Sequence, residues 1–164
     1  VKTRVDIWIN PWSDTQDKGY QIVQALIAIS SGGLFGLGLG LGTPRMIPYY
    51  HTDFIFAAIC EEFGIIFAVG MLALYCFLIM RGLRIALEAS TAFHSLMALG
   101  ATLMLAVQTF VIVGGVTKMV PLTGVTLPFV SAGGSSLISC MAMIGILLGV
   151  SSLNRQERAR ALRS

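Results

Sequence analysis

Charged residues, and acidic residues above all, are scarce in this chain of 164 residues. Only 12% of the residues are charged and 55% are hydrophobic, whereas an ordinary soluble domain carries about 25% charged residues. Of the eight acidic residues, only Glu88 and Glu157 follow Glu62. The mean hydropathy is +0.81. This composition excludes an ordinary soluble domain and predicts a membrane protein.

Cysteine is also rare, and its placement argues against metal or redox chemistry. Cys60, Cys76 and Cys140 lie in apolar stretches without CxxC spacing, so we interpret them as small buried hydrophobic residues. The net charge of +3 comes from scattered basic residues that form no basic face with interleaved aromatics, which excludes nucleic-acid binding. The opening VKTRVDIW has neither an initiator Met nor an apolar signal region, so we expect a piece of a longer protein.

Three apolar stretches are long enough to cross a bilayer, which takes about 20 residues. We predict an all-α polytopic membrane protein with transmembrane helices at about 55–80, 92–117 and 135–153. An outer loop, 118–134, joins the last two helices, and a basic tail, 154–164, follows the third.

The first 54 residues are predicted to form a large loop outside the membrane. Within them, the stretch 22–42 is apolar but contains six glycines after Ile29. A continuous helix through this stretch would lose about 1 kcal/mol for each glycine relative to alanine. We therefore predict a short helix followed by a re-entrant or interfacial segment that borders a cavity. The spacing GLGLGLG is not a dinucleotide fingerprint, because Leu41 stands where the third glycine is needed.

Lysine and arginine predict the orientation of the spans. Arg81 and Arg84 follow the first span, and the tail carries four further arginines. The positive-inside rule assigns both regions to the cytoplasm, so 1–54 and 118–134 are expected to face outward. The tail arginines are interpreted as topology determinants that can also touch anionic lipid.

The outer side gathers the candidate functional residues. Asp14 and Asp17 flank a turn after Asn10-Pro11, where aspartate is common for structural reasons. Their functional interpretation is a general base poised over a membrane-bound substrate. His51 precedes the first span and is a candidate for substrate binding.

A second group of candidates combines acids and cations near the membrane boundary. Glu61 and Glu62 lie about two turns into the first predicted span, where ionisable residues are costly and are functional hypotheses by default. Ion pairing inside the bundle with Lys118 or Arg45 is the structural alternative. The same two cations could instead hold a phosphate.

Four stretches occur in an order that resembles a known family. NPWSD…GYQ, GLGLG, HTDFIFAAICEEFG and PLTGVTLPFVSAGGSS together resemble the C-terminal region of the SEDS family of peptidoglycan glycosyltransferases (FtsW, RodA, SpoVE). The resemblance implies a fold of about ten transmembrane helices, of which this chain is similar to the last three and the large outer loop before them. GVTLPF is closer to the division and sporulation branch, whereas SAGG replaces the usual SYGG.

The resemblance implies a lipid II polymerase that acts in cell division, elongation or sporulation. Such an enzyme transfers the growing glycan from undecaprenyl pyrophosphate to the sugar 4-hydroxyl of lipid II. Asp14 matches the family's essential aspartate, and Asp17 is its rival because D-T-Q-D departs from the usual D-P-x-G. Lys118, and less strongly Arg45, match cations for the leaving pyrophosphate, and the two glutamates are expected to have a structural or cavity role and not a catalytic one.

The resemblance also implies a location and partners. It implies a multi-pass protein of the bacterial cytoplasmic (inner) membrane, with class B penicillin-binding proteins and other divisome or elongasome membrane proteins as partners. A requirement for a divalent cation stays open. Two alternatives remain: a lipid II flippase or transporter, and a scaffold that recruits a class B penicillin-binding protein. Transporters place charges at the bilayer midplane, whereas most charges here are predicted on the outer side, which favours outward-facing chemistry.

Overall fold

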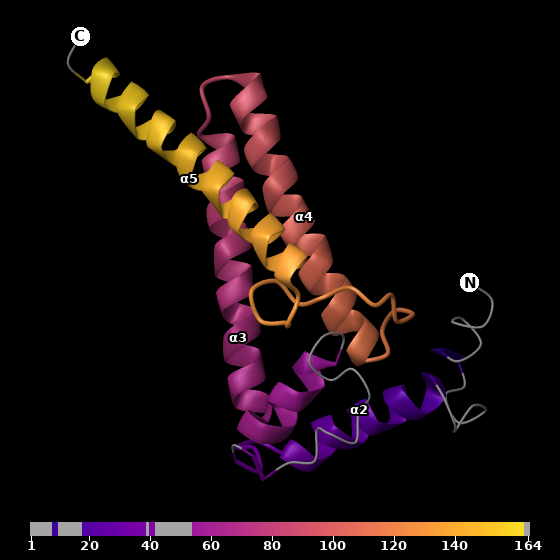
Figure 1. Cartoon of the computed structure of the whole chain (residues 1–164). Coiled ribbons are helices and arrows are strands. Elements are labelled where there is room, and N and C mark those ends of the chain that lie inside the picture. Colours follow the sequence, from indigo (N-terminus) through magenta and orange to yellow (C-terminus); the bar gives the residue numbers. More distant parts are fainter. Residues whose placement is uncertain (1–7, 10–17, 39, 42–53, 163–164) are drawn as a thin grey trace.

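The computed structural model describes residues 8–9, 18–38, 40–41 and 54–162 of the chain. Within this part of the chain every regular element is a helix, and three helices are long and apolar enough to cross a membrane. The prediction of an all-α protein with three membrane spans is therefore confirmed. The helices are α2 (Lys18–Gly32), α3 (Ile55–Leu87), α4 (Ala92–Val116) and α5 (Gly134–Ala161) (Figure 1).

Two helices run further than the sequence predicts. The first was expected to end near residue 80 but continues to Leu87, and the third continues past residue 153 to Ala161. Residues 154–161 thus continue α5 as helix beyond the predicted span. The physical reason is that Arg, Glu, Gln and Ala are good helix formers, so a helix need not stop where its apolar stretch stops.

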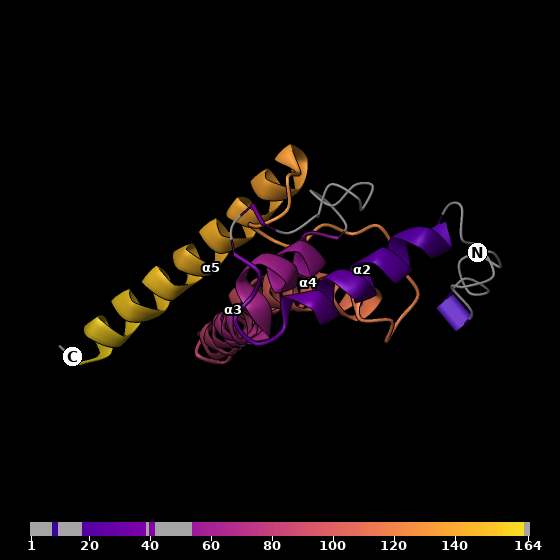
Figure 2. The same ribbon diagram turned by 90° about the horizontal axis from the view of Figure 1, so that it is seen from below.

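The helix α2 lies crosswise to the membrane-spanning helices. Figures 1 and 2 show α3 and α4 side by side, α5 crossing them obliquely, and α2 running across one end of the group. With 15 residues, α2 is about 22 Å long at 1.5 Å per residue, which is too short to cross the roughly 30 Å of hydrocarbon. α2 packs mainly on α3.

The helix α3 is broken near its N-terminal end. Gly64 has φ 83° and ψ 171°, which are not helical values, and it separates a short segment, 55–63, from a long one, 65–87. At 1.5 Å per residue the long segment measures about 34 Å, enough to span a bilayer without the short one.

The glycine-rich loop after α2 fills this break and bonds to both of its edges. Two carbonyl groups at the end of the short segment accept hydrogen bonds from the loop, and two amides at the start of the long segment donate to it. The bonds are Leu37 N to Glu61 O (2.9 Å), Gly38 N to Glu62 O (3.0 Å), Ile65 N to Gly33 O (3.0 Å) and Ile66 N to Leu34 O (3.3 Å).

Glycine is required here because the two backbones touch. A Cβ on Gly36 would lie 2.2 Å from the carbonyl oxygen of Glu62, and one on Gly64 would lie 2.4 Å from that of Leu34. Both glycines also have positive φ, +80° and +83° respectively, a conformation that L side chains rarely adopt. The predicted re-entrant or interfacial segment is thus a loop packed backbone to backbone against a broken helix.

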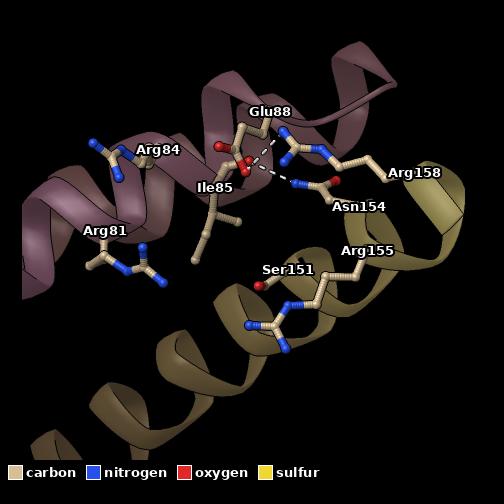
Figure 3. Close-up of a pocket in the computed structure, with 8 residues that line it drawn as sticks. All are labelled: Arg81, Arg84, Ile85, Glu88, Ser151, Asn154, Arg155 and Arg158. Carbon is tan, nitrogen blue, oxygen red and sulfur yellow. Dashed lines mark hydrogen bonds and ion pairs between the residues drawn. The ribbon is translucent and has the colours of Figure 1, made fainter. Parts of the chain in front are cut away.

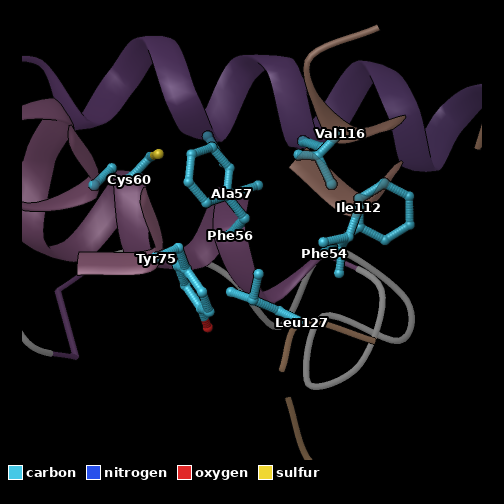
Figure 4. Packing of buried hydrophobic residues seen from close by; sticks show 11 residues of the cluster. Phe54, Phe56, Ala57, Cys60, Tyr75, Ile112, Val116 and Leu127 are labelled. Atoms are coloured by element: carbon cyan, nitrogen blue, oxygen red, sulfur yellow. The ribbon is translucent and has the colours of Figure 1, made fainter. Parts of the chain in front are cut away.

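A hydrophobic cluster joins this end of the molecule to the spans (Figure 4). Phe54 and Leu127, two of its large side chains, are each only 1% exposed. The Tyr75 hydroxyl donates to the carbonyl oxygen of Pro128, which fastens the loop between α4 and α5 to α3. A second cluster packs α5 against α3 and α4 near their other ends.

Substitution of single glycines tests the contact between the loop and the broken helix. Gly36→Ala should lower the free energy of unfolding by about 3–5 kcal/mol, because it combines a left-handed backbone with overpacking against a carbonyl group. Gly40 has φ +74°, but a Cβ added to it would have no neighbour within 4 Å, so Gly40→Ala should cost only about 1 kcal/mol. Denaturant unfolding in detergent micelles measures both. Equal losses of stability in the two variants would contradict the close contact between the loop and the broken helix.

Candidate functional site

The predicted site residues fall into two groups. Asp14, Asp17, Arg45 and His51 lie outside the described residues, whereas Glu61, Glu62 and Lys118 lie within them. Glu61 and Glu62 belong to the short segment of α3, beside the glycine-rich loop, and Lys118 follows the C-terminal end of α4.

Glu61 lines a cavity of about 190 Å³ between α2, the glycine-rich loop and the short segment of α3. Its side chain is deeply buried, at 4% exposure. Gln24 and Ser31 of α2 add polar groups to the wall, and Leu37 and Leu41 of the loop add apolar ones. The cavity is therefore a small, partly polar space with a carboxyl group in its wall.

One face of α2 supplies the opposite wall. Gln24, Ala28 and Ser31 line the cavity and are separated by four and three residues, which places them on one side of a helix. That spacing is visible in the sequence, but the sequence does not show which helix this side of α2 packs against. Sequence reasoning missed these residues because it considered only ionisable groups.

Glu62 has a different role from its neighbour. Its Oε1 atom accepts a hydrogen bond of 3.2 Å from the backbone N–H of Gly40. Adjacent helical residues point about 100° apart, so one glutamate lines the cavity while the other holds the glycine-rich loop. The predicted ion pairing of these glutamates with Lys118 or Arg45 stays a prediction.

Lys118 occupies a backbone position that usually belongs to glycine. It follows the C-terminal end of α4 with φ 62°. The Met119 N–H donates to Gly114 O (2.7 Å) and the Lys118 N–H donates to Gly115 O (3.3 Å), the two bonds of a Schellman cap. A non-glycine residue in this conformation costs about 1 kcal/mol. Such a strained position at a suspected site supports a functional reason for the side chain.

The Lys118 side chain and backbone are tied to the N-terminal part of the chain. Its Nζ atom lies 3.4 Å from the carbonyl oxygen of Ile9 and donates to it. In return, the indole Nε1 of Trp8 donates to the carbonyl oxygen of Lys118 at 3.0 Å. Sequence reasoning missed this role of Trp8, because the partners are 110 positions apart.

A polar network holds the loop between α4 and α5 in place. Gln108, in the middle of α4, donates to the carbonyl oxygen of Thr126 at 2.9 Å. The Thr126 hydroxyl donates to Ser136 Oγ at 2.7 Å. A lone glutamine in an apolar helix is a signal that sequence reasoning could have used, since amides within a membrane tend to find a partner in the bundle.

Comparisons with known proteins agree with this architecture. A family model described as cell cycle protein, which covers FtsW, RodA and SpoVE, matches residues 1–156. The chain is a multi-pass membrane protein, and it belongs to this family, as its resemblance to the SEDS proteins predicted.

Curated relatives come from several branches of the family. The chain is 46% identical over 151 residues to peptidoglycan glycosyltransferase RodA of Mycobacterium tuberculosis. It is 44% identical over 154 residues to stage V sporulation protein E of Bacillus subtilis. It is 42% identical over 153 residues to the probable peptidoglycan glycosyltransferase FtsW of Geobacter metallireducens. These matches cover 92%, 93% and 92% of the chain but only 32%, 42% and 41% of the relatives, and they do not favour the division and sporulation branch.

Two solved structures share the fold. One is from a study of how a peptidoglycan synthase complex coordinates polymerization and crosslinking, with a TM-score of 0.73 and 33% identity, covering 92% of this chain and 41% of that one. The other is a mutant of the rod shape determining protein RodA of Thermus thermophilus, with a TM-score of 0.60 and 37% identity. The match covers 79% of this chain and 40% of that one.

The cap geometry of Lys118 leads to a stability prediction. Lys118→Gly should leave the fold intact and should be about 1 kcal/mol more stable than Lys118→Ala, because only glycine relieves the left-handed backbone. Thermal unfolding of the two variants in the same detergent measures the difference. If the alanine variant were as stable as the glycine variant, the positive φ would not be a source of strain.

Proposed function

We propose that the protein containing this chain is a peptidoglycan glycosyltransferase that polymerises lipid II. The main support is the similarity over 92% of the chain to a relative named peptidoglycan glycosyltransferase RodA. Because the chain spans 32% of that relative's length, the activity is proposed for the whole protein. A cavity with a buried carboxyl group, at one end of an apolar bundle, suits a substrate with a polar head and a lipid tail.

In this proposal the chain contributes a base and cations to glycosyl transfer. Asp14 takes the proton of the acceptor 4-hydroxyl as its oxygen bonds to the anomeric carbon of the donor. The bond from that carbon to the pyrophosphate oxygen breaks, and Lys118 and Arg45 stabilise the charge that develops on the leaving group. Asp17 remains the rival base. Glu61 lines the cavity for the sugar head, and Glu62 holds the loop that forms part of its wall. His51 is proposed as a further substrate-binding residue.

The orientation and partners belong to the same proposal. The positive-inside rule assigns the Arg81 and Arg84 end of the bundle to the cytoplasm of a bacterial cell and the cavity to its outer side. A class B penicillin-binding protein is proposed as partner. The support is that one similar structure comes from a synthase complex with both polymerization and crosslinking in its title.

Lipid II polymerisation by the full-length protein, purified with its partner, tests this function. Asp14→Ala should lower the rate about a hundredfold or more, as expected for loss of a general base, whereas Asp17→Ala should stay near wild type. Lys118→Gly should lower the rate about tenfold, the effect of one lost charge-assisted contact, with no loss of stability. Lys118→Arg, which keeps the charge, is the matched control.

The outcomes separate the competing functions. If Asp14→Ala and Lys118→Gly both polymerise like wild type, the catalytic assignment is wrong, and a transporter or a scaffold becomes the better hypothesis. If Asp17→Ala alone abolishes polymerisation, the activity stands and the base is Asp17. Equal binding of the partner by every variant checks that a loss of rate does not reflect a loss of the complex.

A further inference from the structure

A second cavity, of about 240 Å³, lies between α3 and α5 at the end of the bundle opposite α2 (Figures 1 and 3). Arginine dominates its lining, with Arg81 and Arg84 from α3 and Arg155 and Arg158 from α5. Glu88 is the only carboxylate among the described lining residues, and it pairs with Arg158 at 3.3 Å. The cavity thus carries an excess of positive charge that the proposed glycosyl transfer does not use.

The two walls of this cavity are fixed relative to each other. Asn154 is 6% exposed, and its amide donates to the carbonyl oxygen of Ile85 at 3.1 Å, which joins α5 to α3 at the floor. The ion pair of Arg158 and Glu88 makes a second link. Figure 3 shows the Arg81 side chain extended toward α5 and the Arg155 side chain extended along α5 toward Ser151. Positive-inside topology requires basic residues near the span ends, but it does not require them to meet in one cavity.

The depth of the cavity matches the membrane surface. On α3, Arg81 is the first charged residue after Glu62, and on α5, Arg155 is the first charged residue of the whole helix. Each arginine therefore marks the point where its helix leaves the apolar layer. Leu148, two turns before Arg155, is 64% exposed on the apolar side of this boundary. An anion held here would have water on one side and acyl chains on the other.

We propose that this cavity binds the phosphate group of an anionic phospholipid, with Arg81 and Arg155 as its principal contacts. Guanidinium groups suit this ligand because they bind phosphate oxygens bidentately. Basic pockets between membrane helices are known places for anionic lipid headgroups. A soluble phosphate has the same headgroup chemistry, but a cavity at the apolar boundary favours a phosphate that carries acyl chains. The proposal does not depend on the proposed enzymatic activity.

Native mass spectrometry of the full-length protein in detergent tests the proposal. It compares the binding of phosphatidylglycerol with that of phosphatidylcholine carrying the same acyl chains. The wild type should retain phosphatidylglycerol preferentially. Arg81→Gln and Arg155→Gln should each weaken that binding about tenfold, the effect of one lost charge-assisted contact. Arg160→Gln is the matched control, because Arg160 lies on the same helix and its loss changes the charge equally, but it does not line the cavity. It should change binding less than about twofold.

Three outcomes would overturn the proposal. An equal effect of Arg160→Gln would indicate attraction by the general surface charge. Retention of phosphatidylglycerol by both lining variants would exclude the cavity as the site. Displacement of the lipid by an equal concentration of glycerophosphate would identify a site for a soluble anion. If Arg155→Gln fails to fold, Arg155→Lys tests the same contact, with reduced binding expected because lysine lacks the bidentate geometry.

Discussion

The contact between the glycine-rich loop and the break in α3 is the constraint on which the rest of the structure depends. At membrane depth an exposed peptide group has no water to bond, so irregular backbone is stable only where protein satisfies it. The loop meets that condition through four backbone hydrogen bonds across the break at Gly64. The contact places α2 crosswise under the bundle and turns the short segment of α3, with its two glutamates, toward α2. The cavity exists because this break exists.

The two ends of the bundle have different chemistry. One end combines a buried carboxyl group with Lys118, which occupies a left-handed position where glycine would be more stable. The opposite end gathers arginines around the floor made by Asn154. Between the ends, the described parts of α3, α4 and α5 carry almost no charge. A molecule built this way presents distinct polar surfaces to the two sides of a membrane, and a locally unfavourable choice such as Lys118 is expected at a functional site.

Much of the architecture could be predicted because it depends on length and hydrophobicity alone. Three spans follow from three apolar stretches of about 20 residues, and an irregular segment follows from the cost of successive glycines in a helix. The helix ends were harder to place, since Arg158 and its neighbours continue α5 and pair with α3. Glu61 and Glu62 could be predicted as site residues, but their separate roles depend on what each one faces. The roles of Asp14, Asp17, Arg45 and His51 remain predictions, because these residues lie outside the described part of the chain.

By itself the sequence determined the class of protein, the number of spans and the family, because hydropathy and ordered motifs are properties of the chain read in one dimension. Only the tertiary structure decided which distant groups meet. Trp8 bonds to Lys118, the loop bonds across Gly64, and the arginines of α3 and α5 line one cavity. Such contacts depend on where each helix bends and crosses its neighbours. Those angles are set by many small packing contacts at once, which no single segment of the sequence specifies.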